Sequence, residues 1–218
     1  MGFIVYNIHM KKIYFVRHGE SEGNIGPVRQ SPETNLTSTG LKQAHILAER
    51  LSAIDFDLLI SSPYIRTHQT AEIISQKTNK PIVFSDLVIE RKRPSEQIGQ
   101  LKSSENNIQS EIEYAKAFIE NKKYKDGESF EEIRDRAKQA LEFLDGQDYD
   151  SAVVVTHAVF LKVICGLVLL GEHMNAENCF KLIKNLKAHN TAITVIEKDS
   201  NNNWRVMVIN DYAHFAEY

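Results

Sequence analysis

The chain has 218 residues, a length that suits one sizeable domain or at most two small ones. Hydrophobic residues make up 42% of it, charged residues 25%, and the formal net charge is −3, which is ordinary for a globular protein. This balance disfavours a dedicated nucleic-acid binder, which usually carries a basic excess, and it disfavours intrinsic disorder. We predict a single domain over residues 1–218, with 1–9 as a candidate N-terminal extension because Met10 could be the natural start.

Strand and helix patterns alternate along the chain, and each is bounded by turn residues. Ser62 and Pro63 are typical of an N-cap and a first helical position. The predicted elements are a strand over 12–17, a helix over 40–54, a strand over 56–61, a helix from 63 to about 77, a strand over 81–84, an irregular stretch over 85–107, helices over 108–121 and 129–144, a strand and a helix within 151–171, a helix over 178–185, and strands over 191–197 and 204–209.

This alternation predicts an α/β fold, a three-layer α/β/α sandwich around a mostly parallel mixed sheet. The last two strands are joined by a short polar turn and therefore add an antiparallel hairpin.

The apolar segment over 151–171 is long enough to span a bilayer. It contains His157 and Lys162, however, and a lysine in mid-membrane costs about 2.5 to 3.5 kcal/mol. Its β-branched start favours a strand followed by a helix, so we expect no membrane span. The N-terminus does not resemble a signal peptide, and Cys165 and Cys179 are too few for a disulfide framework, so we expect a reducing, cytoplasmic setting.

Polar side chains gather where the predicted strands end. Arg17 and His18 follow the first strand, Ser62 and then Arg66 follow the second, and His157 follows the valine-rich strand. In open α/β sheets, ligands bind outside the carboxyl ends of the strands. Arginine grips phosphate oxygens in a bidentate manner, and a histidine nitrogen can accept a phosphoryl group. The sequence therefore predicts one electropositive pocket suited to a phosphate.

Four ordered segments resemble the histidine phosphatase, or phosphoglycerate mutase-like, superfamily. They are FVRHGESEGN over 15–24, LTSTGLKQA over 36–44, SSPYIRTHQTA over 61–71 and VVTHAVFLK over 154–162. The resemblance implies that His18 is the nucleophile, that it forms a phosphohistidine, and that Glu90 is the general acid. The residues that it implies for binding the transferring phosphoryl group are Arg17, Asn24, Arg66 and His157, of which Arg17, Arg66 and His157 also belong to the catalytic set. No metal or cofactor is implied.

Two departures from the family pattern bear on the activity. His157 is followed by Ala158 where glycine is common, although the backbone N–H of Ala158 could still contact a phosphoryl oxygen. The segment that begins at Glu90 reads ERKRPSEQIG and lacks the glycine-containing pattern of the glycolytic mutases. We therefore expect a metal-independent phosphomonoester phosphatase, a hydrolase, with a phosphoglycerate mutase as the alternative and a non-catalytic phospho-ligand-binding module as a third interpretation.

Several assignments stay open. Glu20 or Glu96 could be confused with the acid, and the run Arg91 to Arg93 is either a solvated basic turn or a reader of a second anionic group, with Arg91 as the candidate. The remaining histidines show no metal-ligand spacing. The expected partners are a small phosphorylated substrate and inorganic phosphate as product, with no nucleic acid and no membrane. A homodimer is left open, and so is the substrate, whose choice we place in residues 85–109.

Overall fold

The computed structural model of the protein describes residues 11–215. The candidate start at Met10 and the extension over 1–9 lie outside the described residues. Within 11–215, no helix combines the length and the apolar character that crossing a membrane requires. The apolar segment over 151–171 forms a strand followed by a helix, as its β-branched start predicts.

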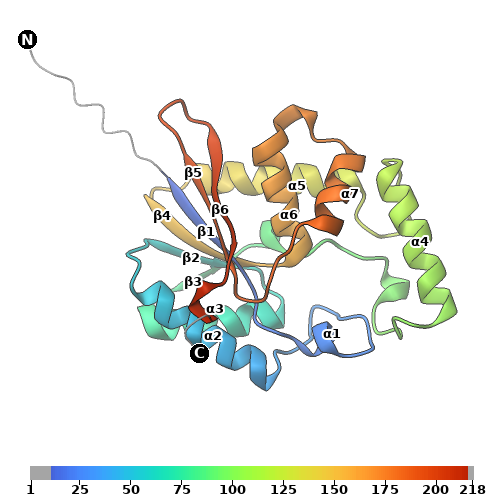
Figure 1. Ribbon diagram of the computed structural model, residues 1–218, viewed down its shortest axis with the longest axis horizontal. Coiled ribbons are helices and arrows are strands. Elements are labelled where there is room, and N and C mark those ends of the chain that lie inside the picture. The colour runs from blue at the N-terminus through green and yellow to red at the C-terminus, as the bar shows by residue number, and fades with distance from the viewer. Residues whose placement is uncertain (1–10, 216–218) are drawn as a thin grey trace, which may run out of the picture.

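One six-stranded sheet lies at the centre of the fold (Figure 1). Its strands are β1 (Lys12–Arg17), β2 (Leu58–Ser61), β3 (Ile82–Phe84), β4 (Ser151–Thr156), β5 (Ile193–Lys198) and β6 (Trp204–Asp211). Their order across the sheet is β3-β2-β4-β1-β5-β6. The first four strands pair in parallel, whereas β5 is antiparallel to both of its neighbours. The prediction of a mostly parallel mixed sheet with a closing hairpin is confirmed.

Helices cover both faces of this sheet (Figure 1). The helices of the described chain are α1 (Glu22–Ile25), α2 (Ser38–Ser52), α3 (Ile65–Thr78), α4 (Glu105–Ile119), α5 (Phe130–Asp145), α6 (Ala158–Leu170) and α7 (Ala176–Asn185). Residues of α2 and α3 form the core on one face, and residues of α5, α6 and α7 form the larger core on the other. The three-layer arrangement is therefore as the alternating pattern predicts.

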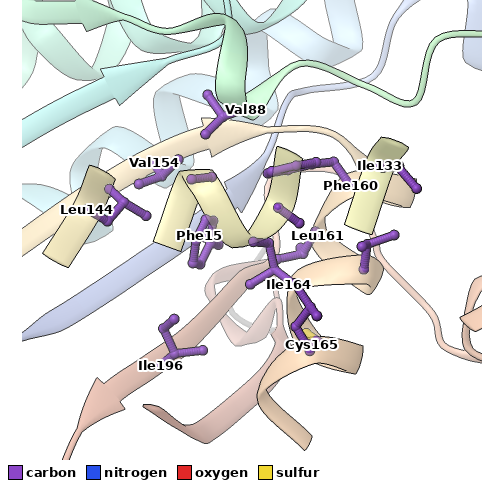
Figure 2. Packing of buried hydrophobic residues seen from close by; sticks show 14 of the residues in the cluster. Phe15, Val88, Ile133, Leu144, Val154, Phe160, Leu161, Ile164, Cys165 and Ile196 are labelled. Atoms are coloured by element: carbon purple, nitrogen blue, oxygen red, sulfur yellow. The ribbon is translucent and has the colours of Figure 1, made fainter. Parts of the chain in front are cut away.

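Strand β4 divides its side chains between these two cores. Val154 packs with Phe160 of α6 and Leu144 of α5 on one face (Figure 2). Val153 and its second neighbour Val155 pack in the core that α2 and α3 cover. All are fully buried, and a buried aliphatic side chain contributes about 1.5 to 3 kcal/mol to folding. The strand that carries His157 is thus fixed from both sides.

Strand pairing brings three functional segments to one edge of the sheet. Arg17 at the end of β1 lies opposite Thr156 at the end of β4, and Ser61 at the end of β2 lies opposite Val155. The residues that follow these parallel strands therefore emerge side by side, which is where ligands bind in such sheets.

Two local predictions need correction. Helix α3 begins at Ile65 with Tyr64 as its N-cap, so Ser62 does not cap it and Pro63 is not its first residue. The physical reason is that the backbone is still extended at Tyr64, so the helix starts only at Ile65. The Ser62 hydroxyl accepts from the N–H of Tyr64 at 3.4 Å and also contacts a histidine. The short helix α1, which carries Asn24, was not predicted, because four residues give no periodic pattern.

Candidate active site

His18 lies directly after β1 and is 1% exposed. Its backbone N–H donates to the carbonyl of Thr156 at 3.0 Å, which ties it to the neighbouring strand. Its ring Nδ1 lies 2.7 Å from the carbonyl of Gly19, and Arg66 Nε donates to its Nε2 at 3.2 Å. Because a carbonyl only accepts and a guanidinium only donates, this network assigns the proton to Nδ1 and the lone pair to Nε2.

Arg66 joins the two histidines of the site. It is the second residue of α3 and is 2% exposed. Besides His18, its guanidinium donates from Nη2 to Nδ1 of His157 at 3.1 Å and from Nη1 to the carbonyl of Ser31 at 2.9 Å. A cation in the first turn opposes the helix dipole, so this position favours an anion nearby.

His157 is fully buried and precedes the first residue of α6. Its Nε2 lies 2.9 Å from the hydroxyl of Ser62, and since Nδ1 accepts from Arg66, Nε2 carries the proton. The ring centroids of His18 and His157 are 5.2 Å apart. From the sequence, Ser62 was placed at the end of the second strand and as a helix cap, but its role as the partner of His157 was missed.

Burial and nearby arginines keep both rings uncharged. Burial, and next the Arg66 guanidinium, lower the pKa of His18 well below its usual value of 6.5. The same two causes, in the same order, lower the pKa of His157 well below 6.5. Burial also lowers the pKa of Arg66 to about 10, which leaves it protonated at neutral pH. The site therefore presents a neutral imidazole beside a fixed cation.

Arg17 approaches the site from the end of β1. Its Nη1 donates to the carbonyl of Ala188 at 2.6 Å, and its buried Nε has no hydrogen-bond partner among the residues that the structure describes. Burial lowers the pKa of Arg17, and the carboxylate of Glu90 acts in the opposite direction. Arg17 also contributes to the lowered pKa values of His18 and His157, so its charge reaches both rings.

Asn24 is held by backbone and side-chain contacts at the loop after His18. Its Oδ1 accepts from the backbone N–H of Ser21 at 3.0 Å and from Nδ2 of Asn190 at 3.2 Å. Asn190 also donates to the carbonyl of His18 at 2.9 Å. Asn190 comes from the loop before β5 and was missed, because a single asparagine in a polar loop carries no sequence signal.

The Glu90 carboxylate lies over the start of α6. It accepts from the backbone N–H groups of Val159 and Phe160 at 3.3 and 3.1 Å, a position that the helix dipole favours. It also accepts from the N–H of Arg91 at 2.9 Å. Neither of the two alternative acids is placed there: Glu20 accepts from the hydroxyl of Thr37, and Glu96 from that of Ser110.

A buried ion pair fixes the segment that carries Glu90. Arg136 of α5 donates to the carbonyls of Leu87 and Ile89 at 3.0 and 2.9 Å, and it forms a bidentate pair with Glu128, with both distances 2.8 Å. These contacts were missed, since nothing in the sequence links residues 87–90 to 128–136.

The other family-like segments hold the loop after His18. Thr70 of α3 accepts from the N–H of Gly19 at 3.1 Å, and Gln43 of α2 accepts from the N–H of Glu20 at 2.8 Å. At Gly40, a Cβ would lie 1.9 Å from the carbonyl oxygen of Glu20, so only glycine allows this close approach. These residues therefore hold the backbone of the loop after His18 in place.

A cavity of about 510 Å³ opens beside these residues, and its walls include Asn24, Arg66, Glu90 and Arg91. His18 and His157 adjoin it through Arg66, which contacts both. Arg91 is 7% exposed and stacks over the rings of Tyr114 and Phe118, so the interpretation as a fully solvated turn is wrong for this residue. The structure brings Ala158 to the first position of α6, next to the N–H groups that Glu90 accepts from.

The two cysteines belong to the larger hydrophobic core. Cys165 and Cys179 are buried thiols, and burial raises the pKa of each to about 12. Across residues 11–215, no three His, Cys, Asp or Glu side chains gather as a metal site would require.

Comparisons with known proteins identify the family of the chain. The model of the histidine phosphatase superfamily (branch 1) matches residues 13–212. The chain is 28% identical over 220 residues to a probable phosphoglycerate mutase, GpmB, of Proteus mirabilis, covering 95% of this chain and 96% of that protein. It is 28% identical over 214 residues to phosphoserine phosphatase 1 of Hydrogenobacter thermophilus, covering 96% of each chain.

Solved structures share the fold. A putative alpha-ribazole-5'-P phosphatase of Escherichia coli superposes with a TM-score of 0.77 at 20% identity, over 92% of this chain and 96% of that one. The extent of the family match, together with the ordered segments and the paired histidines, assigns the chain to the histidine phosphatase superfamily.

Proposed function

We propose that this protein is a phosphomonoester phosphatase, a hydrolase, that works without a metal ion through a phosphohistidine on His18. The observation that carries the proposal is the arrangement of Arg66 between two neutral imidazoles, with hydrogen bonds of 3.2 and 3.1 Å to His18 and His157. Phosphoryl transfer needs positioning and charge neutralisation more than covalent assistance. Arg17, Arg66 and His157, which gather at this edge of the sheet, supply both.

In the first step, Nε2 of His18 attacks phosphorus in line with the leaving oxygen. The Nδ1–H of His18 donates to the carbonyl of Gly19, which directs the ring and stabilises the positive charge that develops on it. Binding of the phosphoryl group replaces the hydrogen bond from Arg66 to Nε2 with one from Arg66 to a phosphoryl oxygen. Arg17, Asn24, His157 and the N–H of Ala158 are the other groups that we assign to these oxygens.

In the same step, the P–O bond to the alcohol breaks, and Glu90 donates a proton to the leaving oxygen. In the second step, water attacks the phosphohistidine, Glu90 takes a proton from that water, and the P–N bond breaks to release inorganic phosphate and restore His18. The contacts of Glu90 with the first turn of α6 and the bracing of residues 87–90 by Arg136 support this role, because a general acid must be held within reach of the leaving oxygen.

Hydrolysis of p-nitrophenyl phosphate, followed with and without a chelator, tests the proposal. We expect turnover that persists in the chelator and falls at least about a thousandfold in His18→Ala, because the covalent route is then lost. His45→Ala is the matched control, since this histidine is exposed on α2, away from the site. Full activity of His18→Ala, or complete dependence on a divalent metal ion, would contradict the proposal.

A phosphoglycerate mutase is the second candidate, and the relatives of that name support it. A mutase returns the phosphoryl group from His18 to the substrate, whereas a phosphatase transfers it to water. Incubation with 3-phosphoglycerate separates the two: 2-phosphoglycerate accumulates for a mutase and inorganic phosphate for a phosphatase. The relatives named as phosphatases, and the segment after Glu90, favour the phosphatase. A binding module without turnover is the outcome if neither product forms while phosphate binds tightly.

The two cysteines, both buried as thiols, support a reducing, cytoplasmic setting as part of this proposal.

A further inference from the structure

The loop before β5 folds back onto the segment that carries His18. The N–H of Thr191 donates to the carbonyl of Arg17 at 2.9 Å, and the carbonyl of Ala188 accepts from the Arg17 guanidinium at 2.6 Å. Between these two residues of the loop, Asn190 donates from Nδ2 to the carbonyl of His18 at 2.9 Å. The loop is therefore fastened to the strand end from which the proposed nucleophile emerges.

This loop has a costly backbone conformation at Thr191. The residue has a φ of 58°, in the left-handed region, where a β-branched side chain is a genuine outlier. The N–H of Ala192 donates to the carbonyl of His189 at 3.2 Å, which closes a turn with Asn190 and Thr191 at its centre. Backbone strain of this kind persists where the surroundings impose it, and it gathers at functional sites. The strained turn holds Asn190 where its side chain reaches His18.

The contacts of Asn24 determine which end of its amide is free to bind a ligand. A backbone N–H only donates, so the Asn24 atom that lies 3.0 Å from the N–H of Ser21 is the oxygen Oδ1. The same oxygen accepts from Nδ2 of Asn190 at 3.2 Å. Within residues 11–215, Nδ2 of Asn24 donates to no other group, and Asn24 lines the cavity. Asn24 thus offers donors to a ligand, as a phosphoryl oxygen requires.

The amide of Asn190 is fixed by the same rule. The carbonyl of His18 only accepts, so the Asn190 atom beside it is Nδ2. Of the two N–H bonds on this nitrogen, one serves His18 and the other serves Asn24. Rotation of either amide by 180° would bring two donors or two acceptors face to face. Each amide therefore keeps the other in one orientation.

A purely structural interpretation explains less of this geometry. Asn24 belongs to a capping box, and its contact with the N–H of Ser21 satisfies the start of α1 without any help from Asn190. Asn190 is not among the described residues that line the cavity, so it would act on a ligand there through Asn24. Its contacts with His18 and Asn24 are those of a residue that orients its neighbours.

Resting on the proposed phosphatase activity, we propose that Asn190 is a positioning residue for the phosphoryl group. It holds the Asn24 amide with Nδ2 toward the cavity, so that Asn24 donates to an oxygen of this group. The carbonyl of His18 anchors Asn190 in turn. Loss of the Asn190 side chain frees the Asn24 amide to rotate and to turn its oxygen, which repels the phosphoryl oxygens, toward the ligand.

A double-mutant cycle over Asn24 and Asn190 tests the proposal. Two quantities are measured for each protein: the Kd for inorganic phosphate by calorimetry, and kcat/KM for p-nitrophenyl phosphate. We expect Asn190→Ala to weaken phosphate binding and to lower kcat/KM about threefold to tenfold each, the worth of one hydrogen bond. In the Asn24→Ala background, the same substitution should change either quantity by less than about twofold, because the amide that Asn190 positions is gone.

Structural damage gives a different pattern. If Asn190 only supported the loop, its loss would also disturb Arg17, and the effects of the two substitutions would multiply. Asn190→Ser is a second truncation that keeps a residue favoured in turns, so the cycle can be repeated if the alanine variant does not fold. Asn201→Ala, in the exposed turn between β5 and β6, is the control, with unchanged Kd and kcat/KM.

Equal fold-changes for Asn190→Ala in the natural and the Asn24→Ala backgrounds would overturn the inference, and so would unchanged phosphate binding in Asn190→Ala. Failure of the proposed function looks different. In that case His18→Ala hydrolyses p-nitrophenyl phosphate as fast as the natural protein, whereas the coupling measured by phosphate binding does not depend on turnover.

Discussion

The proposed attack of His18 on phosphorus requires a neutral imidazole, and holding this imidazole neutral in the fold makes the protein less stable in acid. Below pH about 6.5 an exposed imidazole binds a proton, whereas His18 and His157 stay neutral in the fold because burial and Arg66 hold their pKa values well below that value. The unfolded chain then binds more protons than the folded one. The stabilisation that comes from keeping His18 and His157 neutral is fully present above pH 6.5. It decreases as the pH falls from 6.5 toward the lowered pKa values of the two histidines.

We therefore expect the free energy of unfolding to decrease below pH 6.5 by about 1.4 kcal/mol per pH unit for each of these two histidines. Urea unfolding at a series of pH values measures it, with the double variant His18→Gln/His157→Gln for comparison. The double variant should lack this part of the pH dependence. Identical slopes for the two proteins would mean that the histidines are not held neutral.

Ser62 offers a second test at the scale of single residues. Its hydroxyl accepts from Nε2 of His157 and so fixes which nitrogen faces Arg66. In Ser62→Ala we expect kcat to fall about five- to tenfold with little change in KM, the worth of one such hydrogen bond. Ser62→Thr keeps the hydroxyl and should recover most of kcat. Equal kcat values for the Ala and Thr variants would rule out this positioning role.

At the scale of elements, the loop after His18 is fastened to the start of α2. The Thr37 hydroxyl accepts from the N–H of Gly40 at 3.0 Å and caps the helix, and Gly40 lies against the backbone of Glu20. The apolar spacing of the sequence predicted α2. The close approach of the Gly40 and Glu20 backbones could not be predicted, because a glycine in a sequence does not show which distant residue will pack against it.

Gly40→Ala would place a methyl group 1.9 Å from the carbonyl oxygen of Glu20. We expect a loss of about 1 to 3 kcal/mol of stability, as for overpacking, together with a lower kcat because the loop that carries His18 must shift. Thermal unfolding and steady-state kinetics measure both. Gly146→Ala is the control, since its nearest atom is at 3.4 Å, and its unfolding free energy should change by about 0.5 kcal/mol or less. Normal activity and stability of the Gly40 variant would contradict the close approach.

Helix α5 positions the proposed acid through Arg136. In Arg136→Met the buried Glu128 carboxylate loses its partner, so we expect a loss of about 3 to 5 kcal/mol of stability. Turnover should fall more for an alkyl phosphate than for p-nitrophenyl phosphate, because the better leaving group needs less help from Glu90. Arg134→Met, on the same helix but half-buried and paired with the exposed Asp135, is the comparison.

An equal loss with both substrates would show that Arg136 supports the fold without acting through Glu90. The double variant Glu128→Gln/Arg136→Met separates the two effects. It removes the unpaired buried charge, so it should regain stability without regaining the lost activity toward the alkyl phosphate.

For the whole molecule, alternation of strands and helices was enough to predict the layers and the edge at which His18, Ser62 and His157 meet. That part was predictable because parallel strands align their carboxyl ends wherever they lie in the sheet. Asn190 and Arg136 could not be found in the same way. They come from loops and helices whose contacts depend on how distant segments pack. Contacts of this kind cannot be predicted from a single sequence.

The net charge of the chain likewise does not show where the charged side chains lie in the fold. The whole chain is slightly acidic at −3, yet the cavity gathers arginines and lysines on one side of the fold. A composition that excludes a basic surface does not exclude a cationic pocket, because a few side chains held at strand ends and loop bridges are enough to create one.

The central claim is that His18 carries the phosphoryl group during turnover. Rapid quenching in alkali with ³²P-labelled phosphomonoester, followed by peptide mapping, tests it most directly. We predict an acid-labile label on the peptide that contains His18, present at early times in the natural protein and absent in His18→Ala. A label on another residue, or turnover with no phosphoryl-enzyme at any quench time, would contradict the account.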